Sequence, residues 1–349
     1  MPVDREKLKK VLAAVVLKND GPTATQSESL KVVALATGTK CIGGRYLRED
    51  GRALQDCHAE VVVRRAFMRY LYNQLLKCLQ QQEQNVILEK KAGGKYCLKP
   101  GISIHLYVSS SPCGDATVFG HFDNHPNRMS RGVARVKIES GEGAVRIQSK
   151  SQNWENIHGE SQRLQTMSCS DKIARWNVLG VQGSLLSMYL EPVYFRSVTI
   201  GGEVREEHFK RAVYGRINSI SELPTEYRIN CPDLLRVSHP GVRNRKSHDL
   251  SMNWLSGEET VELVKCQNGL QHLNQAPSRL GKRAMFQYFR DVSSFYFNPY
   301  QIRGPQLTSY SETKAKAWNY QLAKREFFKR YLSLGGWVKK PPVVDNFSV

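Results

Sequence analysis

Three short segments, far apart in the chain, each offer a side chain that binds metal ions, and together they constrain the fold most. The segments are Asp56-Cys57-His58-Ala59-Glu60, Ser111-Pro112-Cys113-Gly114-Asp115 and Met167-Ser168-Cys169-Ser170-Asp171. One His and two Cys make the three protein ligands of a catalytic zinc site, whose fourth position is left for water. We therefore expect a fold that brings His58, Cys113 and Cys169 together, with Glu60 beside them as a proton carrier rather than a ligand.

The sequence predicts rigid elements next to these candidate ligands. A helix that begins at Asp56 or Cys57 and runs to about Gln82 would place His58 and Glu60 in its first turn. Alternating apolar residues at 104–108 predict a half-buried strand that leads to the second segment. The third segment has the pattern of a helix N-cap, so a second helix is expected to begin near Cys169. A helix start favours a thiolate, which is the form that binds zinc.

Other segments complete a coarse prediction of the fold. Strands are expected at 31–37, 193–200 and 261–264, and a last helix at 312–332. The apolar run 11–17 is too short to span a membrane and is predicted to be a helix packed on the core. Because strands and helices are mixed along the chain, we expect an α/β architecture with a βαβ core and several additions.

The balance of charges favours a polyanionic partner. The 349 residues contain 51 Lys and Arg against 32 Asp and Glu, a formal net charge of +19. Such a charge fits nucleic acid, although it could also serve solubility alone. Eight cysteines in a chain of this size are expected to be thiols and metal ligands of an intracellular protein, in the nucleus, the cytoplasm or both, rather than disulfides.

The segments, and the long interval between Cys113 and Cys169, resemble the catalytic domain of adenosine deaminases acting on RNA, the family that edits double-stranded RNA. The most specific stretches are Lys137-Ile138-Glu139-Ser140-Gly141-Glu142-Gly143, Lys172-Ile173-Ala174-Arg175-Trp176-Asn177, Ser278-Arg279-Leu280-Gly281-Lys282 and Trp337-Val338-Lys339-Lys340-Pro341. The resemblance covers nearly the whole chain. It implies a single catalytic domain over 1–349, with a cytidine-deaminase-like core, a central sheet flanked by helices, and no double-stranded-RNA-binding domain.

The resemblance also implies a reaction. It is the zinc-dependent hydrolytic deamination of adenosine to inosine in double-stranded RNA, a form of mRNA processing. The metal ligands would be His58, Cys113 and Cys169, and the proton shuttle Glu60. The family flips the target adenosine out of the duplex, and Glu142 matches the loop residue that fills the vacated space. No membrane partner is expected, and a homodimer is left open.

Two sets of basic and aromatic residues match binding surfaces of the family. Phosphate contacts to RNA are expected from Lys40, Arg128, Arg131, Arg135, Arg163 and Lys246. A second set matches residues that enclose inositol hexakisphosphate inside the domain: Arg64, Arg65, Lys172, Arg175, Trp176, Gln182, Lys282, Tyr310, Lys314, Tyr320, Lys324, Trp337 and Lys340. So many cations beside core aromatics would repel one another unless a polyanion lay among them.

The chain also departs from the family pattern, and two other functions remain open. Gln55 stands where Asn is usual, Thr117 where Arg is common, Lys339 where an acidic residue often sits, and Met129 where a basic residue is found. These positions concern the RNA and polyanion contacts rather than the zinc ligands. The alternatives are a tRNA adenosine deaminase of the same superfamily and a non-catalytic RNA-binding relative.

Overall fold

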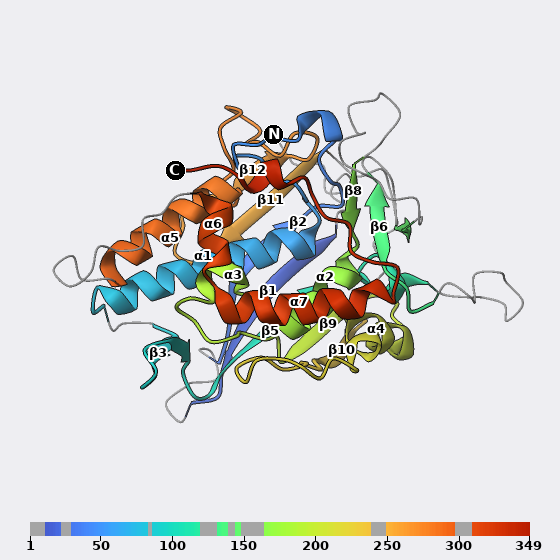
Figure 1. Cartoon of the computed structure of the whole chain (residues 1–349), viewed down its shortest axis with the longest axis horizontal. Coiled ribbons are helices and arrows are strands. Elements are labelled where there is room, and N and C mark those ends of the chain that lie inside the picture. Colours follow the sequence, from blue (N-terminus) through green and yellow to red (C-terminus); the bar gives the residue numbers. More distant parts are fainter. Residues whose placement is uncertain are drawn as a thin grey trace, which may run out of the picture.

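A seven-stranded mixed sheet forms the centre of the molecule (Figure 1). The computed structural model describes residues 11–21, 29–82, 86–118, 131–138, 144–147, 164–238, 249–296 and 309–349. The strand order is β10-β9-β5-β1-β2-β11-β12, in which β10, β9 and β5 are parallel and the other neighbours antiparallel. The strands are β1 (Leu12–Asn19), β2 (Leu30–Thr37), β5 (Ile102–Val108), β9 (Ser197–Gly201), β10 (Asp233–Val237), β11 (Leu250–Leu255) and β12 (Glu262–Lys265).

Helices cover the sheet on the side seen in Figure 1. α1 (Ala59–Leu79) lies against β1, β2 and β11 and contacts α5 (Lys282–Tyr296). α2 (Cys169–Leu179) contacts α4 (Glu206–Val213) and α7 (Trp318–Leu332), while the short α3 (Gly183–Leu186) contacts α6 (Tyr310–Ala315). This mixed α/β architecture, with a central sheet and flanking helices, confirms the predicted fold class.

Two small sheets complete the described part of the chain. One joins β3 (Leu88–Lys90) to β4 (Tyr96–Leu98), and the other has the order β7-β6-β8. In the second sheet, β6 (Arg135–Ile138) lies between β7 (Val145–Arg146) and β8 (Gln165–Met167). Since β8 leads directly into α2, this sheet lies next to the predicted cysteine ligands.

The helix predicted at 11–17 is wrong, because this run forms the central strand β1. β1 pairs with β2 on one side and β5 on the other, and Ala13, Ala14, Val15 and Leu17 are all buried. A strand with both faces covered is apolar at successive positions, so its sequence lacks the alternation that would separate it from a buried helix.

The last predicted helix is divided into α6 and α7. The break follows from external hydrogen bonds to the end of α6, where the carbonyl of Lys314 accepts from Ser184 Oγ at 3.0 Å and Gln321 Nε2 at 2.7 Å. These donors satisfy a carbonyl that would otherwise need the next helical turn. At the other predicted helix, α1 begins at Ala59 with His58 as its N-cap, so His58 precedes the first turn instead of lying in it.

Candidate metal centre and cation pocket

The two predicted cysteine ligands lie side by side, although they come from distant segments. Cys113 follows β5, and Cys169 is the first residue of α2, capped by Ser168 as predicted. The backbone N–H of Cys169 points at Cys113 Sγ, 3.4 Å away. The next residue, Ser170, donates its N–H to the carbonyl of Cys113 at 3.0 Å and its hydroxyl to that of Pro112 at 3.1 Å. The two segments are therefore joined along their backbones.

This close approach requires a glycine at position 114. Gly114 has φ +112°, which L side chains rarely adopt, and a Cβ added there would lie 2.2 Å from Ser168 Oγ. No side chain fits in that space without moving the N-cap of α2. The glycine in the second segment is thus explained by packing of the two cysteine segments.

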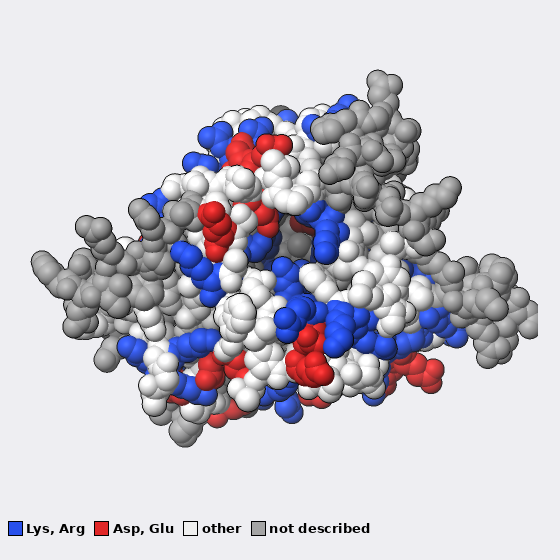
Figure 2. All heavy atoms as spheres, viewed as in Figure 1, with Lys and Arg blue, Asp and Glu red and all other residues white. Residues whose placement is uncertain are grey.

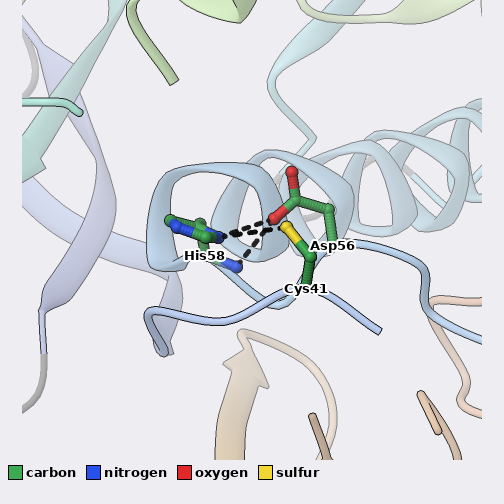
Figure 3. Close-up of side chains that lie close together, drawn as sticks. All are labelled: Cys41, Asp56 and His58. Carbon is green, nitrogen blue, oxygen red and sulfur yellow. Dashed lines mark hydrogen bonds and ion pairs between the residues drawn. The ribbon is translucent and has the colours of Figure 1, made fainter. Parts of the chain in front are cut away.

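His58 is held by a carboxylate that precedes it in the chain. Asp56 Oδ1 accepts the backbone N–H of His58 at 3.1 Å and lies 2.9 Å from its Nδ1 (Figure 3). Cys41 Sγ lies 3.7 Å from the same ring nitrogen. Burial opposes protonation of the ring, but Asp56 and Cys41 outweigh it and raise the pKa of His58 to about 10. Within the described ranges, the ligand atoms of Cys41, Asp56 and His58 form a group that could hold a metal ion.

A buried lysine connects Asp56 to the cysteine pair, and sequence reasoning missed its role. Lys137, on β6, is only 1% exposed; its Nζ lies 2.7 Å from Asp56 Oδ2 and 3.6 Å from Cys169 Sγ. Lys172 also contacts Asp56 Oδ2. The contact with Cys169 and the ammonium of Lys137 lower the pKa of Cys113 to about 6, against the effect of burial. Lys137 lies between Val136 and Ile138 on β6, but Arg135 on the same strand is also a cation, so the sequence carried no clear signal of its role.

Glu60 belongs to the same buried neighbourhood. It lies in the first turn of α1 and is 3% exposed. Burial raises the pKa of the Cys169 thiol, and the nearby cysteine and the carboxylate of Glu60 add to that effect. The electrostatic influence of His58 and Glu60 also reaches Cys113. His58 and Glu60 therefore lie in the electrostatic surroundings of the cysteine pair, although the group of described residues whose ligand atoms meet is Cys41, Asp56 and His58 rather than the predicted set.

A second concentration of charge lies where α1, α2, α5, α6 and α7 meet. Figure 2 shows Lys and Arg side chains around a hollow on this face of the molecule. Several of the predicted polyanion ligands pack on aromatic rings: Arg64 on Trp176 at 5.3 Å, Arg175 on Trp337 at 5.4 Å and Lys314 on Tyr310 at 4.7 Å. Arg175 also approaches the Tyr320 hydroxyl at 3.4 Å. These contacts hold the cations in place, but they do not neutralise them.

Burial disfavours the charged form of these side chains. It lowers the pKa of Arg64 to about 10 and that of Lys282 and Lys324 to about 8, and it lowers the pKa of Arg65 and Lys340 as well. Among the described residues, the buried Arg64 Nε has no hydrogen-bond partner. Asp345 pairs with Lys282 and, at 2.6 Å, with Lys314. Asp345, together with Asp56 beside Lys172, cannot balance this many cations, so the pocket fits a polyanion.

Some predicted ligands of the polyanion make other contacts instead. Gln182 donates Nε2 to the carbonyl of Leu179 at 2.9 Å and accepts the N–H of Val193 on Oε1 at 3.0 Å. Its amide is thus used to hold the backbone after α2. Lys340 contacts Gln55 Oε1, which is the position where this chain departs from the family pattern.

The predicted RNA-contacting residues differ in their exposure to solvent. Lys40 is partly exposed and pairs with Asp249 at 2.5 Å. Arg131 is half-buried and Arg135 is buried at 8% exposure, so neither is a fully solvated surface cation. The remaining candidates lie outside the described residues: Arg128, Glu142, Arg163 and Lys246.

The α/β sheet, the paired thiols and the buried glutamate at a helix start together define a deaminase-type fold and site. The adenosine-deaminase (editase) domain matches residues 34–341, and the chain belongs to that family. It is 40% identical to the double-stranded RNA-specific editase Adar of Drosophila melanogaster over 98% of this chain and 52% of that protein. It is 38% identical to the double-stranded RNA-specific editase B2 of Mus musculus over 97% of this chain and 47% of that protein.

A more distant relative has another substrate in its name. The tRNA-specific adenosine deaminase 1 of Drosophila melanogaster is 28% identical, over 97% of this chain and 90% of that protein. The chain spans about half the length of the two editases. Within the described ranges, no helix has both the length and the apolar character needed to cross a membrane.

Proposed function

We propose that this chain catalyses the hydrolytic deamination of adenosine to inosine in double-stranded RNA, with zinc at the metal centre. The observation that carries the proposal is the buried Glu60 in the same neighbourhood as His58 and the joined Cys113 and Cys169. The relatives of highest identity reported above are named for double-stranded RNA, whereas the tRNA deaminase shares fewer residues.

Two ligand sets compete for the metal, and the chemistry of the ligand atoms favours the predicted one. The alternative set contains Asp56, whose carboxylate already faces the ammonium groups of Lys137 and Lys172. A divalent cation added beside Asp56 would be repelled by both, but Lys137 also lies 3.6 Å from Cys169 Sγ, so charge alone does not decide between the sets. The thiols of Cys113 and Cys169 instead offer two soft ligands, and zinc prefers such thiolates. Asp56 then does not bind the metal itself. Its carboxylate contacts the ring of His58 and fixes the orientation of that ligand.

The fit of His58 follows from the same contacts. Asp56 and Cys41 both approach Nδ1 of the ring, so Nε2 is the nitrogen that these contacts do not use. A metal ligand must be the neutral imidazole, whereas the metal-free surroundings raise the pKa of this ring to about 10. Zinc binding is therefore expected to release a proton from His58.

Zinc at this site would supply a water molecule acidic enough to ionise near neutral pH. Glu60 would take one proton of that water as its oxygen attacks C6 of adenine, and deliver the proton to N1. It would then take the second proton from the attached oxygen and pass it to the amino group, which leaves C6 as ammonia. Its burial suits this work, because a carboxylate shielded from solvent exchanges its proton with the substrate rather than with bulk water.

We infer that the cation pocket holds a compact polyphosphate of the inositol hexakisphosphate kind. The support is the unpartnered Arg64 Nε, the lowered pKa values of Lys282 and Lys324, and the pairing of many cations with only Asp345 and Asp56 among the described residues. Acid digestion of the purified protein, followed by phosphate analysis, should release about six phosphates per chain if the cofactor is present. Phosphate-free protein would contradict this assignment.

The function is tested by inosine formation in two substrates, an RNA duplex with an A·C mismatch and a folded tRNA. We expect conversion in the duplex and none in Glu60→Ala. Conversion in tRNA alone would favour the tRNA deaminase, and zinc-loaded protein that binds RNA without converting it would favour the binding-only alternative.

Metal analysis of Cys113→Ala and Cys41→Ala separates the ligand sets, since only Cys113→Ala should lose zinc. A homodimer and base flipping by Glu142 stay predictions.

A further inference from the structure

Two buried carboxylates follow the two metal-site cysteines at the same distance along the chain. Asp115 lies two residues after Cys113, and Asp171 lies two residues after Cys169. Both have an exposed fraction of 0%. A buried carboxylate is costly unless it is paired and hydrogen-bonded, so the partners of these two side chains show what they hold.

Asp115 links the Cys113 segment to α4 and to the chain that enters β6. Its Oδ2 accepts Nε of Arg211 at 2.9 Å, and its backbone carbonyl accepts Nη2 of the same side chain at 3.0 Å. Its Oδ1 accepts the backbone N–H of Gly132 at 2.9 Å. Asp115 thus fixes two other parts of the fold, α4 and the chain before β6, to the Cys113 segment.

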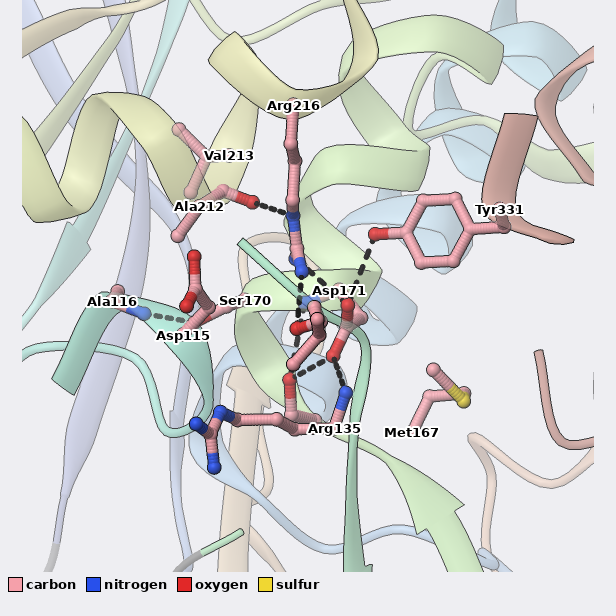
Figure 4. Close-up of polar contacts among 12 residues, drawn as sticks. Asp115, Ala116, Arg135, Met167, Ser170, Asp171, Ala212, Val213, Arg216 and Tyr331 are labelled. Atoms are coloured by element: carbon pink, nitrogen blue, oxygen red, sulfur yellow. Dashed lines mark hydrogen bonds and ion pairs between the residues drawn. The ribbon is translucent and has the colours of Figure 1, made fainter. Parts of the chain in front are cut away.

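Asp171 makes the corresponding links from the Cys169 segment (Figure 4). Its Oδ2 accepts the backbone N–H of Arg135 at 3.0 Å, and Ser168 contacts the same oxygen. Its Oδ1 accepts the hydroxyl of Tyr331 at 3.0 Å and lies 2.7 Å from Nη2 of Arg216. The partners come from β6, α7 and the 3-10 turn after α4, so this carboxylate also joins separate elements.

Together these groups fix the backbone of residues 132–135. The carboxylates of Asp115 and Asp171 bind the N–H groups of Gly132 and Arg135. Between these two residues, the carbonyl of Val133 accepts Nη1 of Arg216 at 3.0 Å. The same stretch leads directly to Lys137, whose Nζ lies 3.6 Å from Cys169 Sγ. Because a β-strand is stiff over two residues, the position of this ammonium depends on how 132–135 is anchored.

We propose that Asp115 and Asp171 are positioning residues for the metal-binding thiols: each fixes the strand that carries Lys137 to the cysteine two residues before it. Nζ of Lys137 is thereby kept 3.6 Å from Cys169 Sγ and 2.7 Å from Asp56 Oδ2, the carboxylate that holds His58. This inference rests on the proposed function in one respect, namely that zinc binds at Cys113 and Cys169. Outer contacts of this kind typically change metal affinity by about 10- to 100-fold.

The test is the rate at which the purified zinc-loaded protein releases zinc to a chelating dye. Asp115→Asn and Asp171→Asn keep the size of the side chain and remove its charge. Glu262→Gln is the matched control, since Glu262 is also buried and accepts from Asn253 Nδ2 at 2.8 Å, but lies on β12, outside the metal centre. We expect release to be about 10-fold faster or more in both Asp variants and unchanged in the control. The kcat should fall in both, with KM for RNA unchanged.

Zinc release at the wild-type rate in both Asp variants would overturn the inference, even if their melting temperatures fall like that of Glu262→Gln. If Asp171→Asn does not fold, Tyr331→Phe decides: it removes one hydrogen bond to Asp171 and keeps the ring. Faster release in Tyr331→Phe supports the inference, and wild-type release overturns it. If the wild-type protein forms no inosine but the Asp variants still release zinc faster, the proposed function is refuted and the positioning role stands. Zinc retained by Cys113→Ala would refute both.

Discussion

Lys324→Glu distinguishes a filled cation pocket from an empty one, because the two states predict opposite signs. Lys324 lies on α7, with Nζ 5.6 Å from the ring of Phe328 and 3.5 Å from Gln321 Oε1. Burial and the like charges of Arg175 and Lys314 lower its pKa from 10.5 to about 8. A difference of this size corresponds to about 3 kcal/mol against the charged form.

In an empty pocket, removing the ammonium would relieve that penalty. Lys324→Met should then raise the free energy of unfolding by up to about 3 kcal/mol, and Lys324→Glu should do at least as well by pairing with its cationic neighbours. In a pocket filled by a polyanion, Lys324→Glu loses an ion pair and adds repulsion, so we expect it to destabilise the fold by about 3 kcal/mol or more. We predict the second result, with loss of bound phosphate.

The assay is thermal unfolding combined with phosphate analysis of the same samples. Arg325→Glu is the matched control, because Arg325 is the next residue on α7, carries the same charge and is 71% exposed. It should change stability by less than about 1 kcal/mol and leave the bound phosphate unchanged. A Lys324→Glu protein that melts at or above the wild-type temperature would refute the reasoning.

The pH dependence gives an independent check on the same pocket. With the polyanion removed, Lys282 and Lys324 have a pKa of about 8 in the folded protein and 10.5 when unfolded. Between these values the unfolded state binds more protons, so stability of the stripped protein should rise as pH increases from 8 to 10.5. The polyanion-loaded protein should lack this rise, and equal profiles for the two forms would contradict the account.

Three further predictions concern the metal centre and the RNA surface. Glu60→Gln should keep its zinc and lose about 10²- to 10⁴-fold in kcat, measured by inosine formation and metal content; loss of the metal would assign Glu60 a structural role instead. Gly114→Ala should lower stability by about 1–3 kcal/mol and release zinc, because its Cβ would lie 2.2 Å from Ser168 Oγ; a protein with wild-type melting and zinc content would show that the two segments can separate. Asp249→Asn frees Lys40 from its ion pair, so RNA binding should tighten up to about fivefold at low salt, with a salt slope steeper by about one; unchanged titrations would exclude Lys40 from phosphate contact.

The start of α2 and the closeness of Cys113 to Cys169 could be predicted from the sequence, whereas the central strand β1 could not. His58, Cys113 and Cys169 carry chemistry that few other residues share, and Ser168 signals a helix start through a local hydrogen bond, so spacing and capping rules suffice. The strand at 12–19 escaped prediction because both its faces are buried, which is a property of its neighbours. Lys137 escaped for the same reason: its partners Asp56 and Cys169 are remote in sequence.

The contact between Cys169 and Cys113 joins residues 56 positions apart in the sequence. A metal ion bound by both thiolates would therefore act as a cross-link that closes a long loop of chain, as a disulfide does in an oxidising compartment. The entropy of closing such a loop grows slowly, by only about 0.6 kcal/mol for each doubling of its length. Outside Gly114, Asp115 and the segment 132–137, which hold the site, the intervening sequence could therefore change in length at little thermodynamic cost to the metal centre. Those parts of the interval are open to variation while the residues that hold the site stay in place.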